Sequence, residues 1–150
     1  MTRQQLTTLA AAGSFTLLAG AYLFQAMGYP PCQMCYWQRW PHMAAIAIGV
    51  LAYFVPARLL ALAGALAAMT TSVIGAYHTG VEKKWWEGPS SCTGDGLGGL
   101  SGADLLSVDG DKLIMCDQVS WEFLTLSMAS WNALCAAGLA VIWLMAARQK

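Results

Sequence analysis

Apolar residues gather in four long stretches of the chain, and a long polar segment separates the third stretch from the fourth. The stretches cover residues 6–27, 40–57, 59–79 and 123–147. A helix that crosses a bilayer needs about 20 apolar residues, so the first, third and fourth stretches are long enough for a span. The second is short and begins with Pro41 and His42, so we expect its outer end to lie in the membrane interface.

This pattern predicts an all-α integral membrane protein. We expect a four-transmembrane-helix bundle with a connection at 28–39 and a long extracytoplasmic loop at 80–122. The alternative for the first stretch is a signal peptide, but the apolar core of a signal peptide is only about 7–15 residues long. The length of the chain fits a single domain over residues 1–150.

Composition and charge agree with a lipid bilayer as the surroundings of this chain. Hydrophobic residues make up 57% and charged residues 11% of it, whereas about 25% of the residues of a soluble domain are charged. The net charge is zero, so nothing favours a nucleic-acid partner. The basic residues Arg3, Arg58, Arg148 and Lys150 share the face that holds both termini, and the positive-inside rule makes that face cytoplasmic.

Small residues recur at regular spacing within two of the apolar stretches. The third stretch has small residues at Ala61, Gly64, Ala68, Ser72 and Gly75. The first has them at Ala12, Ala19 and Ala26, beside Gly13 and Gly20. Small side chains let membrane helices approach one another closely. We therefore expect both sets to face neighbouring helices.

A Cys-x-x-Cys pair, Cys32 and Cys35, stands between the first two apolar stretches. This spacing suits a reversible disulfide, half of a metal site or a haem attachment, but Tyr36 stands where haem attachment needs His. Two prolines directly before the pair favour a helix that begins there. The positive end of that helix, and Arg39 four residues beyond Cys35, would both lower the pKa of Cys35. The alternative is a bare structural disulfide, with Arg39 as a membrane-boundary residue.

Two further cysteines, Cys92 and Cys116, lie in the long polar segment, on the same side of the membrane as the Cys-x-x-Cys pair. They are too far apart in sequence to complete a zinc site, which is built from two closely spaced pairs. The Cys-x-x-Cys loop is too short to stabilise the fold much, so that pair suits redox work. We expect the wide pair to sit in a loop that reaches the thiols of a partner. Cys135 lies in the fourth stretch and is predicted to be a buried small hydrophobe.

Electrons from such a redox pair need an acceptor, and the sequence contains no convincing flavin, nicotinamide, haem or metal motif. Gly94, Gly96 and Gly99 match the dinucleotide fingerprint only by letter, because no strand precedes them. A lipid-soluble quinone would reach the Cys-x-x-Cys pair at the bilayer surface. The residues that could line a quinone site are Tyr36, Trp37, Trp40 and His78, each of which could equally be a membrane-interface residue. Elsewhere in the long polar segment, residues 101–104 resemble a capping box, which predicts the start of a short helix.

Three segments together resemble the DsbB family, disulfide bond formation protein B. They are CQMCYWQR at 32–39, YHTGVE at 77–82 and CDQVSWEFL at 116–124. The resemblance covers nearly the whole chain in matching order, and it is closest to the shorter members. It implies a multi-pass enzyme of the bacterial inner membrane, a protein-dithiol:quinone oxidoreductase with both termini in the cytoplasm. Its partners would be a periplasmic thioredoxin-fold oxidase of the DsbA type and a membrane quinone, either ubiquinone or menaquinone.

The resemblance also implies roles for individual residues. Cys32 and Cys35 would be the quinone-proximal pair, with Cys35 in contact with the quinone. Arg39 would assist quinone reduction. Cys92 and Cys116 would exchange with the DsbA-like partner, with Cys92 as the point of mixed-disulfide attack. Two further residues, His78 and Trp121, match family positions near the quinone and at the base of the loop.

Some features leave alternatives open. A glycine-rich insert at 93–102 departs from the best-known members, which puts the docking geometry of the loop in doubt. In the related vitamin K epoxide reductase family the loop cysteines precede the Cys-x-x-Cys pair, whereas here they follow it. The alternatives are a DsbB paralogue that serves a dedicated partner, and a non-enzymatic, disulfide-stapled four-span membrane scaffold.

Overall fold

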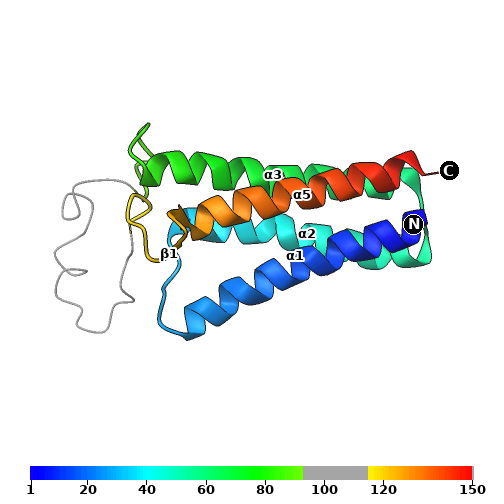
Figure 1. The fold of residues 1–150 in the computed structure, drawn as a ribbon, viewed down its shortest axis with the longest axis horizontal. Helices are drawn as coiled ribbons and strands as arrows, with labels where there is room; N and C mark the ends of the chain where they lie inside the picture. Colours follow the sequence, from blue (N-terminus) through cyan, green and yellow to red (C-terminus); the bar gives the residue numbers. More distant parts are fainter. Residues whose placement is uncertain (93–114, 150) are drawn as a thin grey trace.

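The computed structural model describes residues 1–92 and 115–149, which form a bundle of long helices (Figure 1). In the described residues the helices are α1 (Arg3–Ala26), α2 (Gln33–Phe54), α3 (Arg58–Glu82) and α5 (Met128–Arg148). Each packs against two neighbours, in the cyclic order α1, α2, α3, α5. A short antiparallel pair of strands, β1 (Glu122–Phe123) and β2 (Leu126–Ser127), precedes α5. Both chain ends lie at one end of the bundle and the β-hairpin at the other.

Three of these helices, α1, α3 and α5, are long and apolar enough to cross a membrane. The helix α2 does not meet that criterion, because its first half contains Gln33, Gln38, Arg39 and His42. The all-helical bundle is therefore present, with three candidate spans in the part of the chain described. A membrane crossing by α2 stays a prediction. The glycine pattern at 94–99, the insert at 93–102 and the proposed capping box at 101–104 lie outside the described residues.

The helices α2 and α5 begin several residues away from the starts of the corresponding apolar stretches. The helix α2 begins at Gln33 rather than at 40, because Cys32 acts as its N-cap and its Sγ accepts a hydrogen bond from the Cys35 amide at 3.3 Å. The helix α5 begins at Met128 rather than at 123, because the β-hairpin occupies the preceding residues. Its turn places Leu124 and Thr125 at positive φ, 51° and 64°, which is incompatible with a helix.

The small residues predicted to face a neighbouring helix do so in α3. All five, from Ala61 to Gly75, are buried. A Cβ on Gly64 would lie 2.5 Å from the Trp143 ring of α5, so only glycine allows this approach. In α1 the prediction holds at Gly13, where a Cβ would overlap the Leu139 side chain of α5, but it is wrong for Ala12, Ala19 and Ala26, which are exposed. The apolar residues of α1 surround the helix, so composition alone does not select its buried face. That face holds Leu6, Thr7, Ala10 and Ser14.

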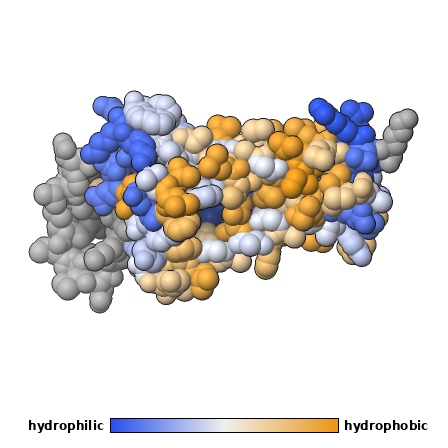
Figure 2. Space-filling view, viewed as in Figure 1, coloured by the Kyte–Doolittle hydropathy of each residue, from blue (hydrophilic) through white to orange (hydrophobic). Residues whose placement is uncertain are grey.

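The outer surface of the bundle is apolar over its middle and polar at its two ends. Figure 2 shows this band of hydrophobic side chains between hydrophilic caps. Large apolar side chains stay exposed along the helices, among them Phe15, Leu66, Val73 and Val141. An exposed apolar surface of this extent needs a covering partner, and lipid supplies one for helices of this length.

Candidate active site

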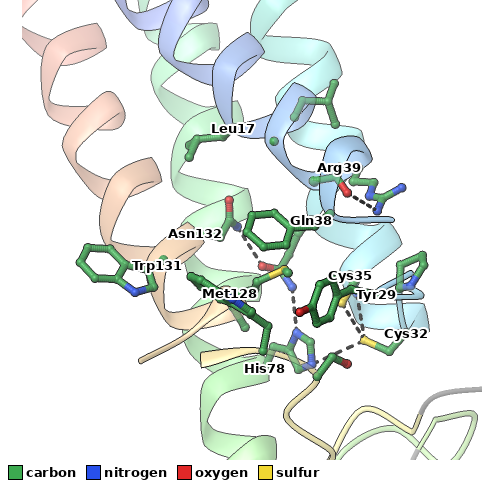
Figure 3. Close-up of a pocket in the computed structure, with 18 of the residues that line it drawn as sticks. Leu17, Tyr29, Cys32, Cys35, Gln38, Arg39, His78, Met128, Trp131 and Asn132 are labelled. Atoms are coloured by element: carbon green, nitrogen blue, oxygen red, sulfur yellow. Dashed lines mark hydrogen bonds between the residues drawn. The ribbon is translucent and has the colours of Figure 1, made fainter. Parts of the chain in front are cut away.

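A cavity of about 440 Å³ lies among the helices toward the end of the bundle that holds the Cys-x-x-Cys pair (Figure 3). Apolar residues of α1 and of the segment before α5 form much of its wall, including Leu17, Phe24, Trp121 and Met128. Its polar lining includes Cys32, Cys35, Gln38, Arg39, His42, His78, Glu82 and Asn132. An apolar cavity with a few convergent polar groups is the usual form of a small-molecule site.

The two sulfur atoms of the Cys-x-x-Cys pair lie 3.0 Å apart at the N-terminus of α2, and both residues are free thiols. A hydrogen bond from the Cys32 thiol holds the pKa of Cys35 below its usual value, while burial opposes this effect and the Arg39 charge adds a small contribution. The same hydrogen bond and burial raise the pKa of Cys32. Cys35 is thus the sulfur that ionises first. This direction agrees with the prediction from sequence, although the leading cause is Cys32 rather than Arg39 or the helix terminus.

His78 projects from α3 onto the Cys-x-x-Cys pair. Its Nε2 lies 3.5 Å from the Cys32 sulfur, and its Nδ1 lies 2.9 Å from the side-chain nitrogen of Gln38. One helical turn further on, a Glu82 carboxylate oxygen is 3.8 Å from the His78 Nε2. The hydroxyl of Ser127 donates to the other carboxylate oxygen. The buried end of α3 therefore places an imidazole and a carboxyl group beside the thiols.

Arg39 is buried, with 6% of its surface exposed, and it connects α2 to α1. Its Nη1 donates to the Gln25 side-chain oxygen at 2.7 Å, and its Nη2 donates to the Ala21 carbonyl at 3.4 Å. The guanidinium also lies over the Tyr22 and Tyr36 rings, 4.6 and 5.0 Å from their centroids. These contacts hold a fixed positive charge in the cavity wall, one helical turn from Cys35.

The second cysteine pair, Cys92 and Cys116, forms a disulfide that packs against the first. Both residues are buried in one cluster with Cys32, Met34 and Val81. Both sulfur atoms are thus buried in this conformation, and exchange of this pair with a partner's thiols stays a prediction. The cluster brings the two cysteine pairs together in one buried group, although they are far apart in sequence.

Other sequence predictions are corrected at two places. Cys135 is exposed on the outer face of α5, not buried, because the buried side of that helix carries Ala136 and Ala140. Three aromatic residues proposed as cavity lining, Tyr36, Trp37 and Trp40, are exposed and do not line the cavity. Their interpretation as membrane-interface residues is the better one.

The ligand atoms of Cys32, Cys35 and His78 lie within 4.8 Å of one another, close enough for one metal ion to bind all three. A structural zinc site takes four such ligands. Two thiols in a Cys-x-x-Cys turn, in one cluster with the Cys92–Cys116 disulfide, also have the arrangement needed for thiol–disulfide exchange.

Several cavity residues were not identified from the sequence, namely Gln38, His42, Glu82 and Asn132. The signal that could have found most of them is polarity inside an apolar helix. Polar groups at membrane depth are costly, so they face the interior of a bundle and mark functional sites. Asn132 in particular has an amide side chain within the apolar stretch 123–147.

The helices, the cavity and the two adjoining cysteine pairs define a membrane-embedded thiol–disulfide redox protein. The family model described as "Disulfide bond formation protein DsbB" matches residues 3–146. Disulfide bond formation protein B of Aromatoleum aromaticum is 31% identical over 147 residues, which cover 87% of this chain and 83% of the relative. The Polaromonas protein of the same name is 26% identical over 155 residues, covering 97% and 90%. No solved structure matches the chain.

The chain therefore belongs to the DsbB family. Membership makes it a disulfide oxidoreductase that takes part in disulfide bond formation. Together with the three apolar helices it also makes the chain a protein of the inner membrane.

Proposed function

We propose that the protein is a protein-dithiol:quinone oxidoreductase that reoxidises a periplasmic thioredoxin-fold disulfide donor of the DsbA type. The observation that carries this proposal is the cluster that holds both cysteine pairs, together with the place of Cys32 and Cys35 in the wall of an apolar cavity. Electrons would enter at Cys92 and Cys116, pass to Cys32 and Cys35, and leave to a membrane quinone. The single chain of 1–150 would then act as one four-helix membrane domain.

The first transfer is an exchange of disulfides. A partner thiolate attacks Cys92, Cys116 leaves as a thiolate, and the second partner thiol then closes the partner's own disulfide. Because Cys92 and Cys116 are buried against Cys32, their packing has to loosen before a partner reaches them. The shared cluster supports a second exchange in which a thiolate of the Cys92 and Cys116 pair attacks Cys32 and Cys35 leaves as a thiolate. The other thiol of that pair then displaces Cys32, which restores the Cys92–Cys116 disulfide and leaves Cys32 and Cys35 reduced. The low pKa of Cys35 makes it the better leaving thiolate.

The cavity fits the head group of a quinone, which supplies a two-electron acceptor when it is bound. Cys35 lies in the cavity wall and its thiolate form is the nucleophile of the pair. Arg39 supplies a fixed charge in the same wall, where the low polarity of the surroundings makes that charge more effective than in water. His78 lies beside Cys32 and is positioned to hydrogen-bond with its sulfur. These are the roles that we propose for Cys35, Arg39 and His78.

The cysteine end of the bundle would face the periplasm and the end with both termini would face the cytoplasm. The supporting observation is that Arg3, Arg58 and Arg148 cluster at the end with the termini, away from the cysteines. A membrane-impermeant thiol reagent, added after reduction to cells with a permeabilised outer membrane, should label Cys92 and Cys116. A single cysteine introduced beside Arg58 should stay unlabelled, and its labelling without lysis would reverse this orientation.

The proposed function is tested by steady-state reduction of a soluble quinone analogue by the purified protein. The donor is either a reduced thioredoxin-fold dithiol protein or a small dithiol. Cys92→Ser should block the protein donor, while the small dithiol still drives quinone reduction through Cys32 and Cys35. A scaffold without enzymatic activity would reduce no quinone with either donor. Activity with a small dithiol but with no DsbA-like donor would favour a paralogue that serves a dedicated partner.

A further inference from the structure

A chain of side-chain hydrogen bonds runs from the Cys32 sulfur toward the middle of the bundle (Figure 3). Beyond His78 it passes through Gln38 of α2 and Asn132 of α5, which lie 2.8 Å apart. It ends at His42, whose Nε2 is 2.8 Å from the Asn132 side-chain oxygen. Each amide has two possible orientations and each neutral imidazole has two tautomers. The direction of donation must therefore be fixed by neighbours that can play only one role.

The first such neighbour is the main-chain carbonyl of Met34. A carbonyl only accepts, so the Gln38 atom at 3.2 Å from it must be the amide nitrogen. The same nitrogen lies 2.9 Å from His78 Nδ1, and its second proton points to the lone pair there. A neutral imidazole carries a single proton, which must then sit on Nε2. His78 consequently directs its proton toward the Cys32 sulfur, and the main chain of Cys116 is a second hydrogen-bond partner of this ring.

The second neighbour is the main-chain carbonyl of Gln38. It accepts the single hydroxyl proton of Thr71 at 2.9 Å, so the Thr71 oxygen has only lone pairs to offer to Asn132. The Asn132 atom at 3.1 Å from that oxygen must be the amide nitrogen, which also donates to the Gln38 side-chain oxygen. Asn132 therefore turns its oxygen to His42, and His42 must carry its proton on Nε2.

The other ring nitrogen of His42 is left with an unshared lone pair. His42 is 3% exposed and lines the cavity, and its buried Nδ1 has no hydrogen-bond partner in the part of the chain that the structure describes. A buried polar atom without a partner is costly, and in a ligand cavity it indicates that the ligand supplies the partner. A bare nitrogen accepts, so the matching ligand group is a hydroxyl and not a carbonyl.

We propose that Gln38 and Asn132 are positioning residues that hold both histidines as Nε2–H tautomers. His78 then donates to the Cys32 sulfur, and His42 offers a free acceptor to a hydroxyl group in the cavity. A donor at Cys32 stabilises its thiolate, the form in which Cys32 closes the disulfide with Cys35. The role of His42 rests on the proposed function, because a reduced quinone carries hydroxyl groups where the oxidised quinone carries carbonyls.

The tautomers can be read directly by nitrogen NMR of the protein labelled with ¹⁵N only in histidine. The chain has two histidines, and His42→Phe assigns the remaining signals to His78. We expect a protonated Nε2 and an unprotonated Nδ1 for both rings at neutral pH, with neither donor nor quinone added. A proton on Nδ1 of either ring would overturn the proposal. This measurement stands whether or not the protein reduces quinone.

Two variants separate the two positioning residues. Gln38→Leu should leave His78 as a mixture of tautomers, while Thr71 still orients Asn132 and His42 stays unchanged. Asn132→Leu should release His42, while the Met34 carbonyl still orients Gln38 and His78 stays unchanged. If neither variant moves the signals of its histidine, Gln38 and Asn132 do not position them.

The matched control for these variants is Ser72→Ala. The Ser72 hydroxyl donates to the Ala133 carbonyl between α3 and α5, outside the chain of hydrogen bonds, so its loss tests general repacking of the same interface. It should leave both histidines unchanged. A tautomer shift in Ser72→Ala comparable with those in the other two variants would mean that any repacking moves the rings, and would contradict a specific positioning role.

The hydroxyl assignment is tested on the Cys35→Ala protein, so that no electrons pass to the ligand. We expect a water-soluble hydroquinone to shift the His42 Nδ1 signal in a saturable titration, and the matching quinone to leave that signal in place. Equal shifts with both ligands, or no shift with the hydroquinone, would show that His42 does not recognise a hydroxyl. Either result would leave the tautomer assignment and the electron-transfer proposal to be judged by their own measurements.

Discussion

At the end of the bundle that holds both termini, the helices meet through alanine and glycine, whereas at the cysteine end they meet through amides, imidazoles and sulfur atoms. The terminal end packs Trp143 against Gly64 and surrounds it with Ala61, Ala65 and Ala140. The cysteine end keeps a cavity and fills its walls with hydrogen-bonded polar groups. One sequence therefore uses close packing at one end and paired polar groups at the other.

The difference teaches where this protein accepts a cost in stability. Burial of polar groups in a membrane bundle contributes less than close packing and is tolerated where every group is paired. Among the described residues, the buried side-chain nitrogen and oxygen atoms without a partner are Ser14 Oγ, Trp143 Nε1 and His42 Nδ1. Of these residues only His42 lines the cavity. A cost at that position is explained by ligand binding rather than by folding.

The largest effect is expected at the thiols of the cysteine end. Cys35→Ser should abolish quinone reduction from protein and small-dithiol donors alike, because serine neither forms a disulfide with Cys32 nor ionises at neutral pH. Quinone absorbance during steady-state turnover is the measurement. Retention of full activity would rule out the relay, whichever donor is used.

Arg39 should have the next largest effect on turnover. Arg39→Ala removes the fixed charge one turn from Cys35 and should slow quinone reduction about tenfold or more, a loss of about 1.4 kcal/mol or above. Arg39→Lys should recover part of the lost rate, since lysine keeps the positive charge but lacks the planar guanidinium whose two Nη atoms donate to Gln25 and Ala21. The measurement is KM and kcat over a range of quinone concentrations.

Because Arg39 is buried and joins α1 to α2, its variants also need a folding control. Circular dichroism and thermal unfolding in detergent would separate a loss of folded protein from a loss of activity per folded molecule. An Arg39→Ala protein that is folded and matches the parent in both constants would make Arg39 a purely structural link between two helices.

At the opposite end, enlarging a close-packed glycine should affect stability rather than turnover. A Cβ on Gly64 would lie 2.5 Å from the Trp143 ring, so Gly64→Val should destabilise the fold by about 1–3 kcal/mol. Unfolding in a detergent titration, followed by circular dichroism, gives the free energy of unfolding. Gly138→Val is the matched control, because a Cβ there meets nothing within 4 Å. Equal destabilisation of both variants would contradict the contrast between the two ends.

Much of the contrast between the two ends of the bundle could be predicted from the sequence, because the features behind it are short sequence patterns. Cys-x-x-Cys spacing, the prolines before Cys32 and the small residues of α3 act over one or two helical turns, which a linear sequence displays. The structure supports the helical start at the pair and the buried face of α3. The length of α1 was likewise anticipated, but not its buried face.

The rest depended on contacts between segments that are distant in the chain. The pairing of His42 with Asn132 joins residues 90 positions apart, and the placement of Cys92 and Cys116 against Cys32 requires the folded bundle. No local pattern encodes these contacts. The β-hairpin before α5 was hidden for another reason, since Phe123 and Leu124 extend the apolar run that continues into the helix.

A smaller effect is expected for the ionisation of Cys35. The leading cause of its lowered pKa is the hydrogen bond from Cys32, so Cys32→Ala should move that pKa upward, because burial then acts unopposed by this bond. The rate of alkylation of Cys35 follows its thiolate and should fall about fivefold or more at neutral pH, the factor for one hydrogen bond. If the pH dependence of Cys35 alkylation in Cys32→Ala matched that of the parent protein, the lowered pKa would be assigned to Arg39 and the helix terminus instead.

The smallest effect is expected at Cys135, which tests whether chemistry is confined to the cysteine end. Its thiol is exposed on the outer face of α5, away from the cavity lining, and its neighbours Leu134 and Val141 present apolar side chains to the same surroundings. Alanine fills nearly the same volume and is equally compatible with lipid, so neither packing nor solvation should change. Cys135→Ala should therefore leave quinone turnover, donor specificity and the free energy of unfolding within error of the parent. A loss of turnover in a stably folded Cys135→Ala protein would mean that a thiol outside the two adjoining pairs takes part in the relay, and the division between a packed end and a reactive end would no longer hold.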